Sequence, residues 1–194
     1  MSKISWKPSN FLYPLPAVIV TVGDEEYTNA ITIAWTGTIC SNPPMVYISV
    51  RPSRHSYNIL KKTREFVINL TTKEIARATD YIGVISGKKE DKIKKMNLTL
   101  EKSNIVKTKQ IVESPVNIEC KVKSIKKLGT HDMFIADVVN VNVDEKYINK
   151  NNKLELEKAG LITYSHGEYF NLGKMIGKFG YSVQKKNKKI KRRK

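Results

Sequence analysis

Cysteine is nearly absent from this 194-residue sequence, which contains only Cys40 and Cys120. The two residues form no CxxC pair, and no cysteine and histidine spacing of the zinc-binding kind occurs. A disulfide framework and a structural metal site are therefore excluded as means of holding the chain together. With 40% hydrophobic residues, the chain is instead long and apolar enough to bury one core.

Long hydrophobic runs are also missing. The opening segment, "MSKISWKPSNFLYPLPAVIV", is interrupted by Pro8, Pro14 and Pro16, so we expect neither a secretion signal nor a membrane span there. The GxGxxG fingerprint of dinucleotide-binding units does not occur either. The scarcity of cysteine and the lack of a secretion signal or membrane span favour a cytoplasmic protein without membrane contact.

Acidic residues are scarce, with 18 Asp and Glu against 35 Lys and Arg and a net charge of +17. Eight positive charges lie in residues 185–194, "KKNKKIKRRK", which leaves +9 for the rest. We predict a single domain over residues 1–184 and a disordered basic tail over 185–194. An alternative function is a non-enzymatic module that contacts RNA or another polyanion through this tail. Nucleic acid is nevertheless an unfavoured partner, because the body lacks interleaved basic and aromatic residues.

The hydrophobic pattern predicts a mainly β domain with short helices. Strand-forming residues alternate on both sides of turns at Gly23 and Gly129, which indicates two hairpins. The segments expected to be strands are 17–22, 27–35, 45–50, 65–70, 116–128 and 132–144. Helical spacing predicts helices over 56–62 and 72–85, the second with Thr72 as its N-cap.

The segment between Asn29 and Leu60, "NAITIAWTGTICSNPPMVYISVRPSRHSYNIL", carries the most chemistry. Hydroxyl side chains are frequent in it, and Gly37 allows a loop whose backbone groups lie against a flat ligand. Pro43 and Pro44 then end this loop and begin the next strand. A polar loop placed before a strand in this way favours contact with a ligand edge.

Four donors follow that strand within six residues: Arg51, Ser53, Arg54 and Ser56. They come directly before the expected helix, so guanidinium groups, hydroxyls and a helix N-terminus would combine into a phosphate site. A ligand edge on one loop and a phosphate on the next is the layout that a mononucleotide needs. The alternative is a strand end rich in Thr and Ser, followed by an ordinary capped helix.

This segment resembles the flavin reductase-like family of FMN-binding split barrels, in particular its flavoredoxin branch. The double proline, "EFVINL", "GTHDMFIADVVNV" and "YFNLGKMIGKFG" are also similar to family elements. The resemblance implies a six-stranded antiparallel split β-barrel that acts as a homodimer, with FMN near the subunit interface. It further implies an FMN-dependent oxidoreductase in which the flavin carries the chemistry, without a catalytic acid or base. NAD(P)H or a redox protein would then supply electrons to the flavin, which passes them to an acceptor.

The same resemblance assigns three groups of residues to FMN. The ring side would be formed by Thr32, Ala34, Trp35, Thr36 and Gly37. The ribityl chain would meet Cys40, which stands where the family usually has serine, and Ser41. The phosphate would bind Arg51, Ser53, Arg54, Ser56 and Tyr57, with His131 at the rim.

Other interpretations of these residues remain open at the sequence level. Trp35 could serve as core or interface packing instead of ring stacking. His55, His131 and His166 match no common metal-ligand spacing, so no metal site is expected. Cys40 has no partner cysteine nearby, which favours a small packed residue over a redox thiol. A hydrolase triad of Ser56, His55 and Asp132 would lack the glycine-flanked nucleophile turn.

Overall fold

The computed structural model describes residues 1–184, so the predicted basic tail of residues 185–194 lies outside the described residues. Strands predominate, as the sequence predicts. The strands are β1 (Leu15–Pro16), β2 (Val18–Gly23), β3 (Thr28–Ile33), β4 (Thr36–Ser41), β5 (Pro44–Val50), β6 (Glu65–Asn69), β7 (Leu100–Glu101), β8 (Gln110–Ile111), β9 (Val116–Leu128), β10 (His131–Val143), β11 (Ile162–Ser165) and β12 (Glu168–Asn171). The α-helices are α1 (His55–Thr63), α2 (Ala76–Val84) and α3 (Lys92–Lys95).

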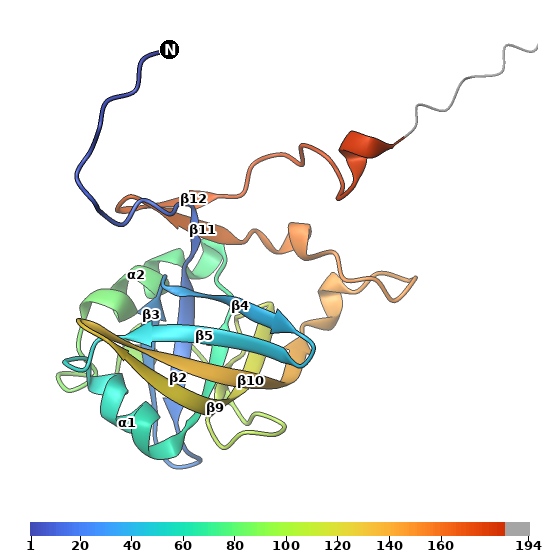
Figure 1. Cartoon of the computed structure of the whole chain (residues 1–194). Helices are drawn as coiled ribbons and strands as arrows, with labels where there is room; N and C mark the ends of the chain where they lie inside the picture. Colours follow the sequence, from blue (N-terminus) through green and yellow to red (C-terminus); the bar gives the residue numbers. More distant parts are fainter. Residues whose placement is uncertain (185–194) are drawn as a thin grey trace, which may run out of the picture.

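Seven strands form one antiparallel sheet in the order β3-β2-β6-β9-β10-β5-β4. Its two edge strands, β3 and β4, are consecutive in the chain and are joined by Ala34 and Trp35 alone. The sheet must therefore curl until its edges meet, which produces the split barrel in Figure 1. The mainly β split-barrel fold is confirmed, with seven strands in the sheet where six were expected.

The barrel is filled by one apolar cluster contributed by six strands and α1. On β2, Val18, Val20 and Val22 point into this cluster. Ile19, on the opposite face of β2, packs beneath α2 and α3 in a second cluster. Both faces of β2 are buried, which explains its continuous apolar run.

The hairpins and both predicted helices are present. The turns at Gly23 and Gly129 join β2 to β3 and β9 to β10, and both glycines have positive φ. The second helical segment begins as a short 3-10 helix, Lys73–Ile75, before α2. Thr72 occupies the N-cap position, as predicted, although its side chain makes no capping hydrogen bond.

Residues 36–41 form a strand, although the sequence predicts a ligand-facing loop. As β4, they pair with β5 through a hairpin that turns at Asn42 and Pro43. Gly37 and Ser41 favour loops, but the two threonines and Ile39 favour strands, and pairing with the apolar β5 makes the whole segment a strand. The backbone groups that were expected to face a ligand are thus partly used within the sheet.

A small separate sheet, in the order β1-β11-β12, lies across the top of the barrel in Figure 1. It brings the N-terminal segment against a hairpin from the C-terminal part of the chain, with Leu15 opposite Tyr164. Tyr169 on β12 donates a hydrogen bond to Asp80 on α2, at 3.3 Å. Within residues 1–184, no helix has the length and apolar character needed to cross a membrane.

Candidate functional site

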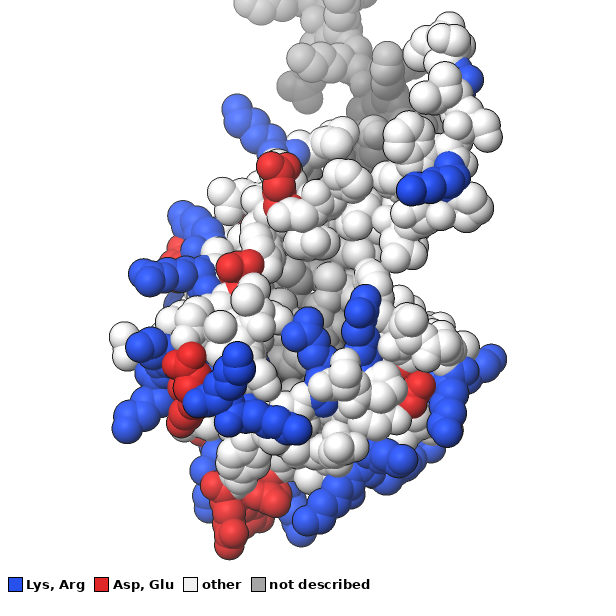
Figure 2. All heavy atoms as spheres, turned by 90° about the vertical axis from the view of Figure 1, so that its left-hand side faces the viewer, with Lys and Arg blue, Asp and Glu red and all other residues white. Residues whose placement is uncertain are grey.

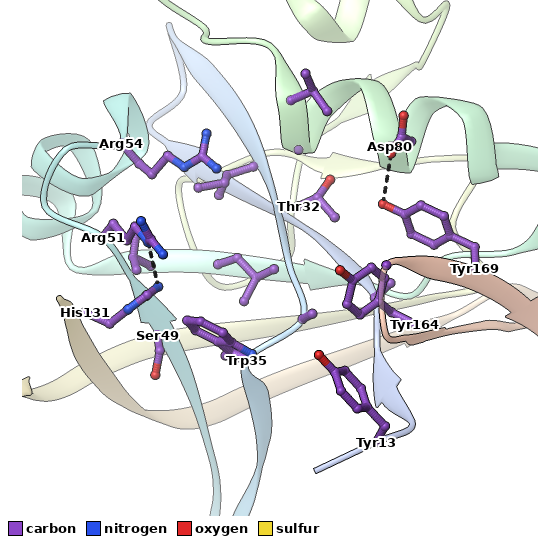
Figure 3. Close-up of a pocket in the computed structure, with 18 residues that line it drawn as sticks. Tyr13, Thr32, Trp35, Ser49, Arg51, Arg54, Asp80, His131, Tyr164 and Tyr169 are labelled. Carbon is purple, nitrogen blue, oxygen red and sulfur yellow. Dashed lines mark hydrogen bonds between the residues drawn. The ribbon is translucent and has the colours of Figure 1, made fainter. Parts of the chain in front are cut away.

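A pocket of about 390 Å³ lies where β3, β5, α2 and the small sheet meet, and is called the main pocket below. Figure 3 shows Arg51, Arg54 and His131 on one side of it and three tyrosines on the other, with Thr32 between. The tyrosines are Tyr13, Tyr164 and Tyr169. The main pocket therefore has a basic end and an aromatic, hydroxyl-rich end, and its volume is suitable for a small organic ligand.

The segment that joins β3 to β4 forms one wall of the main pocket. Thr32, Ala34 and Trp35, which were predicted to contact the ring of a ligand, all line it. The Trp35 carbonyl accepts a hydrogen bond from the Ser49 amide at 2.9 Å, which fixes this segment to β5. The Thr32 hydroxyl donates to the Thr79 carbonyl of α2, so it offers a ligand only an acceptor.

His131 lies between Trp35, in this wall, and the arginines of the basic end. Its ring contacts Trp35 edge to face, with centroids 4.3 Å apart, and its Nε2 accepts a hydrogen bond from Arg51 Nε at 3.3 Å. Partial burial, together with the positive charges of Arg51 and Arg54, lowers the pKa of His131. The neutral ring then carries its proton on Nδ1, which lies 2.9 Å from the Thr130 hydroxyl.

A second hollow of about 230 Å³ adjoins the basic end and is called the serine hollow below. It shares Arg51 and Arg54 with the main pocket and is also lined by Ser53 and Ser56, at the start of α1. Ser56 Oγ accepts a hydrogen bond from Asn29 Nδ2 at 2.7 Å, so its own proton is free to be donated. The serine hollow thus gathers hydroxyl and guanidinium donors beside a helix N-terminus.

Positive charge at the serine hollow is not neutralised within the described chain. None of the ion pairs among residues 1–184 includes Arg51, Arg54 or Lys92, which all line this hollow. Figure 2 shows lysine and arginine side chains around a hollow on the face that carries the start of α1. Donors without a carboxylate partner are the arrangement that binds an anion.

Five predicted site residues do not line either cavity. Thr36 is buried and donates to the Tyr47 carbonyl, while Gly37 pairs with Tyr47 in the sheet. Tyr57 is also buried, and its hydroxyl donates to Asp132 at 2.6 Å. The other two residues, Cys40 and Ser41, lie at the distant end of β4. The pairing of β4 with β5 is what removes the four β4 residues from the pocket wall.

The side-chain geometry of residues 1–184 does not support a hydrolase triad, a metal site or a reactive buried thiol. Asp132 is bonded to Tyr57, and His55 Nε2 lies 3.3 Å from the Tyr27 hydroxyl, so Ser56, His55 and Asp132 form no relay. No cluster of metal-ligating side chains occurs within residues 1–184. Burial, followed by the nearby Glu119 charge, raises the pKa of Cys120 far above its usual value, so this thiol is inert.

Sequence reasoning missed the residues that reach the site from distant parts of the chain. They are Tyr13, Asp80, Lys92, Tyr164 and Tyr169. Asn29 and Ser49, which lie within the segment from Asn29 to Leu60, were also missed. The aromatic end is assembled from both ends of the chain, for which the sequence carries no pairing signal. Asn29 stood at the start of the segment already singled out, and its hydrogen bond to Ser56 could have been proposed.

Comparison with known proteins identifies the family to which this fold belongs. Residues 11–173 match the model of the flavin reductase-like domain. The structure resembles flavoredoxin of Desulfovibrio vulgaris (Miyazaki F), with a TM-score of 0.87 and 26% identity over 94% of this chain and 100% of that one. It also resembles a flavoredoxin from Methanosarcina acetivorans, with a TM-score of 0.85 and 24% identity over 95% and 100%.

A more distant neighbour in fold is an FMN-binding protein from Thermus thermophilus, solved with 1-cyclohex-2-enone. Its TM-score is 0.73, with 22% identity over 88% of this chain and 95% of that one. Because the domain match spans most of the sequence, the chain belongs to the flavin reductase-like family of flavin-related oxidoreductases. Its place there is in the flavoredoxin branch.

Proposed function

We propose that this chain binds FMN in the two adjoining cavities and works as an FMN-dependent oxidoreductase. The observation that carries the proposal is the serine hollow, where Arg51 and Arg54 have no carboxylate partner among the described residues. A phosphate monoester has close to two negative charges at neutral pH and several acceptor oxygens, which match these donors. The main pocket beside it has the size and aromatic lining that suit a flavin ring.

Each side chain would have a distinct task toward the bound cofactor. Arg51, Ser53, Arg54 and Ser56 would hold the phosphate, and the 32–35 segment would contact the ring. The neutral His131 accepts from Arg51 Nε and so keeps that guanidinium at the basic end. The three tyrosines would cover the far end of the main pocket and restrict water there. FMN, when bound, supplies the electron transfer, and the protein supplies position and electrostatics.

We further propose that NAD(P)H or a redox protein donates the electrons. The sequence contains no nucleotide-binding unit of its own for NAD(P)H, so a nicotinamide would have to stack directly against the flavin. The domain unit for this activity would be residues 1–184, which contain the residues proposed here to bind FMN.

The test is an absorption spectrum of the purified protein, followed by titration of the flavin-free protein with FMN. We expect a yellow protein or micromolar and tighter FMN binding, on the order of −8 kcal/mol or better. Anaerobic addition of NADH, NADPH or a reduced ferredoxin would then identify the donor by bleaching the flavin band. Absence of FMN binding to correctly folded protein would contradict the proposal.

We expect the protein to be a homodimer that buries the outward faces of β5 and β10. Tyr47 and Ile135 face each other across these strands and remain half-exposed in one chain. Light scattering should give a dimer for the unchanged protein and a monomer for Ile135→Glu, because a charge in an apolar interface is costly. Ile105→Glu, at an exposed position away from these strands, is the control. A monomeric wild type with FMN bound would refute this expectation.

Removing residues 185–194 should leave FMN affinity unchanged, because the residues proposed above to bind FMN all lie within 1–184. The same truncation removes eight positive charges, so it should elute from heparin at lower salt. A loss of FMN after truncation would show that the tail takes part in the site. A loss of RNA binding with flavin binding absent throughout would instead favour the polyanion-binding alternative.

A further inference from the structure

Large apolar side chains are exposed in close succession after β12. Residues 172–183, called the C-terminal arm below, follow that strand and contain no further strand or α-helix. Ile176 and Phe179 have relative exposures of 92% and 107%, as in an extended chain. The other exposed apolar side chains of the arm are Leu172, Met175, Tyr181 and Val183. An apolar surface of this extent indicates contact with another molecule.

The rest of the described chain does not hold the arm. Within residues 1–184, no hydrogen bond or ion pair joins residues 173–183 to an earlier residue. In Figure 1 the arm runs away from the barrel and from the N-terminal segment. Residues 185–194, which follow it in sequence, contain only one apolar side chain, Ile190, and so offer little apolar surface. The cover for the arm therefore comes from another molecule.

An apolar groove that matches the arm lies at the other end of the chain. It has a volume of about 420 Å³, lies between the N-terminal segment and strands β5 and β10, and is called the N-terminal groove below. Its apolar lining includes Phe11, Leu12, Leu15, Tyr47 and Met133. Phe11 and Leu12 remain 52% and 85% exposed. One copy of the chain thus carries an uncovered apolar arm and an uncovered apolar groove that face away from each other.

We propose that two copies of the chain exchange their C-terminal arms, so that the arm of each subunit packs in the N-terminal groove of the other. A two-fold dimer covers both features of both copies in this way. Six apolar side chains bury on the order of 600 Å² per arm. Two arms and the grooves that receive them would bury about 2,000 Å² or more, which is enough for a stable dimer.

The exchange also places the arm of one subunit at the flavin site of the other. The N-terminal groove and the main pocket share Tyr13, Trp35, Ser49 and His131. An arm seated in the groove therefore covers the outer side of the wall of the main pocket and excludes water from it. This second part of the inference rests on the proposed function, whereas the exchange of arms does not.

The first experiment measures the dissociation of the dimer by sedimentation of the full chain over a series of dilutions. Phe179→Asp, in the arm, and Leu12→Asp, in the groove, should each weaken the dimer about tenfold or more, because each places a charge in an apolar contact. Ile105→Asp is the control, since Ile105 is 54% exposed and lies outside the arm and the groove. It should leave the dimer unchanged. A wild-type dimer that both Phe179→Asp and Leu12→Asp leave intact would overturn the inference.

The second experiment asks whether the arm acts across subunits. Phe179→Asp and Trp35→Ala should each weaken FMN binding about tenfold. A mixed dimer of these two variants, isolated through different affinity tags, contains one site with an intact Trp35, and the other subunit supplies that site with an intact arm. We expect half of the sites in the mixed dimer to bind FMN with wild-type affinity.

If no site in the mixed dimer recovers, the arm serves its own subunit and the inference is overturned. The same holds if Phe179→Asp leaves FMN affinity unchanged. A wild-type protein that binds no FMN would instead contradict the proposed function, and sedimentation would still decide whether the arms are exchanged.

Discussion

Arg51→Ala and Arg54→Ala are each expected to weaken FMN binding about ten- to hundredfold, at a cost of about 1.5–3 kcal/mol. Each substitution removes a charge-assisted donor from a hollow in which neither arginine has a carboxylate partner among residues 1–184. Riboflavin affinity should change far less. Ser53→Ala and Ser56→Ala should act in the same direction but more weakly, because a hydroxyl is a neutral donor. Titration with both flavins measures all four effects.

Arg77→Ala provides the control for this series. Arg77 is an exposed arginine on α2 that lines neither the main pocket nor the serine hollow, and its loss changes the net charge equally. It should leave both flavin affinities intact. Trp35→Ala, on the ring side of the main pocket, should weaken FMN and riboflavin alike. Equal losses for the two flavins in Arg51→Ala and Arg54→Ala would show that the phosphate binds elsewhere.

Glu119→Gln should destabilise the fold by about 2–4 kcal/mol. Glu119 on β9 is fully buried. Its two oxygens accept from three consecutive backbone amides, at Asn104, Ile105 and Val106, and from the side-chain amides of Asn140 and Asn142. Glutamine must place its own N–H groups against some of these donors, which leaves them unsatisfied. Chemical denaturation measures the loss, and the exposed Glu168→Gln is the control.

The acid stability of the protein should depend on the same carboxylate. Burial would raise the pKa of Glu119, but the hydrogen bonds from Asn140 and from the three backbone amides outweigh it and lower the pKa to about 2. The native state therefore binds this proton less readily than the unfolded chain, whose value is near 4.5. The stabilisation is complete above about pH 4.5 and is lost as the pH falls towards 2. Glu119→Gln should have a flatter stability profile across that interval.

The sequence predicted those parts of the fold in which local pattern and tertiary pairing agree. The β2–β3 hairpin has branched residues in its strands and a turn at Gly23, so its local preferences match its final pairing. β4 was missed because its glycine and hydroxyl side chains were interpreted as a polar loop, whereas the segment pairs with the neighbouring β5 as a strand. Curling of the sheet, which brings β3 close to β5, depends on the full strand order.

The candidate site was predictable at its basic end and along the segment that joins β3 to β4, but not at its aromatic end. Arg51, Ser53, Arg54 and Ser56 are close in sequence, so their clustering follows from local spacing. Lys92 was missed because "GKKEDKIKK" has the composition of a solvated surface segment, and burial of one of its lysines depends on the packing of α3. The tyrosines of the main pocket come from the two ends of the chain, which pair only in the folded state.

A crystal structure of the protein with FMN tests the central claim most directly. We predict the phosphate in the serine hollow, within hydrogen-bonding distance of Arg51, Arg54 and the hydroxyls of Ser53 and Ser56. The ring should lie in the main pocket against the segment from Thr32 to Trp35. A phosphate that points into solvent, or a flavin bound outside these two cavities, would contradict the account.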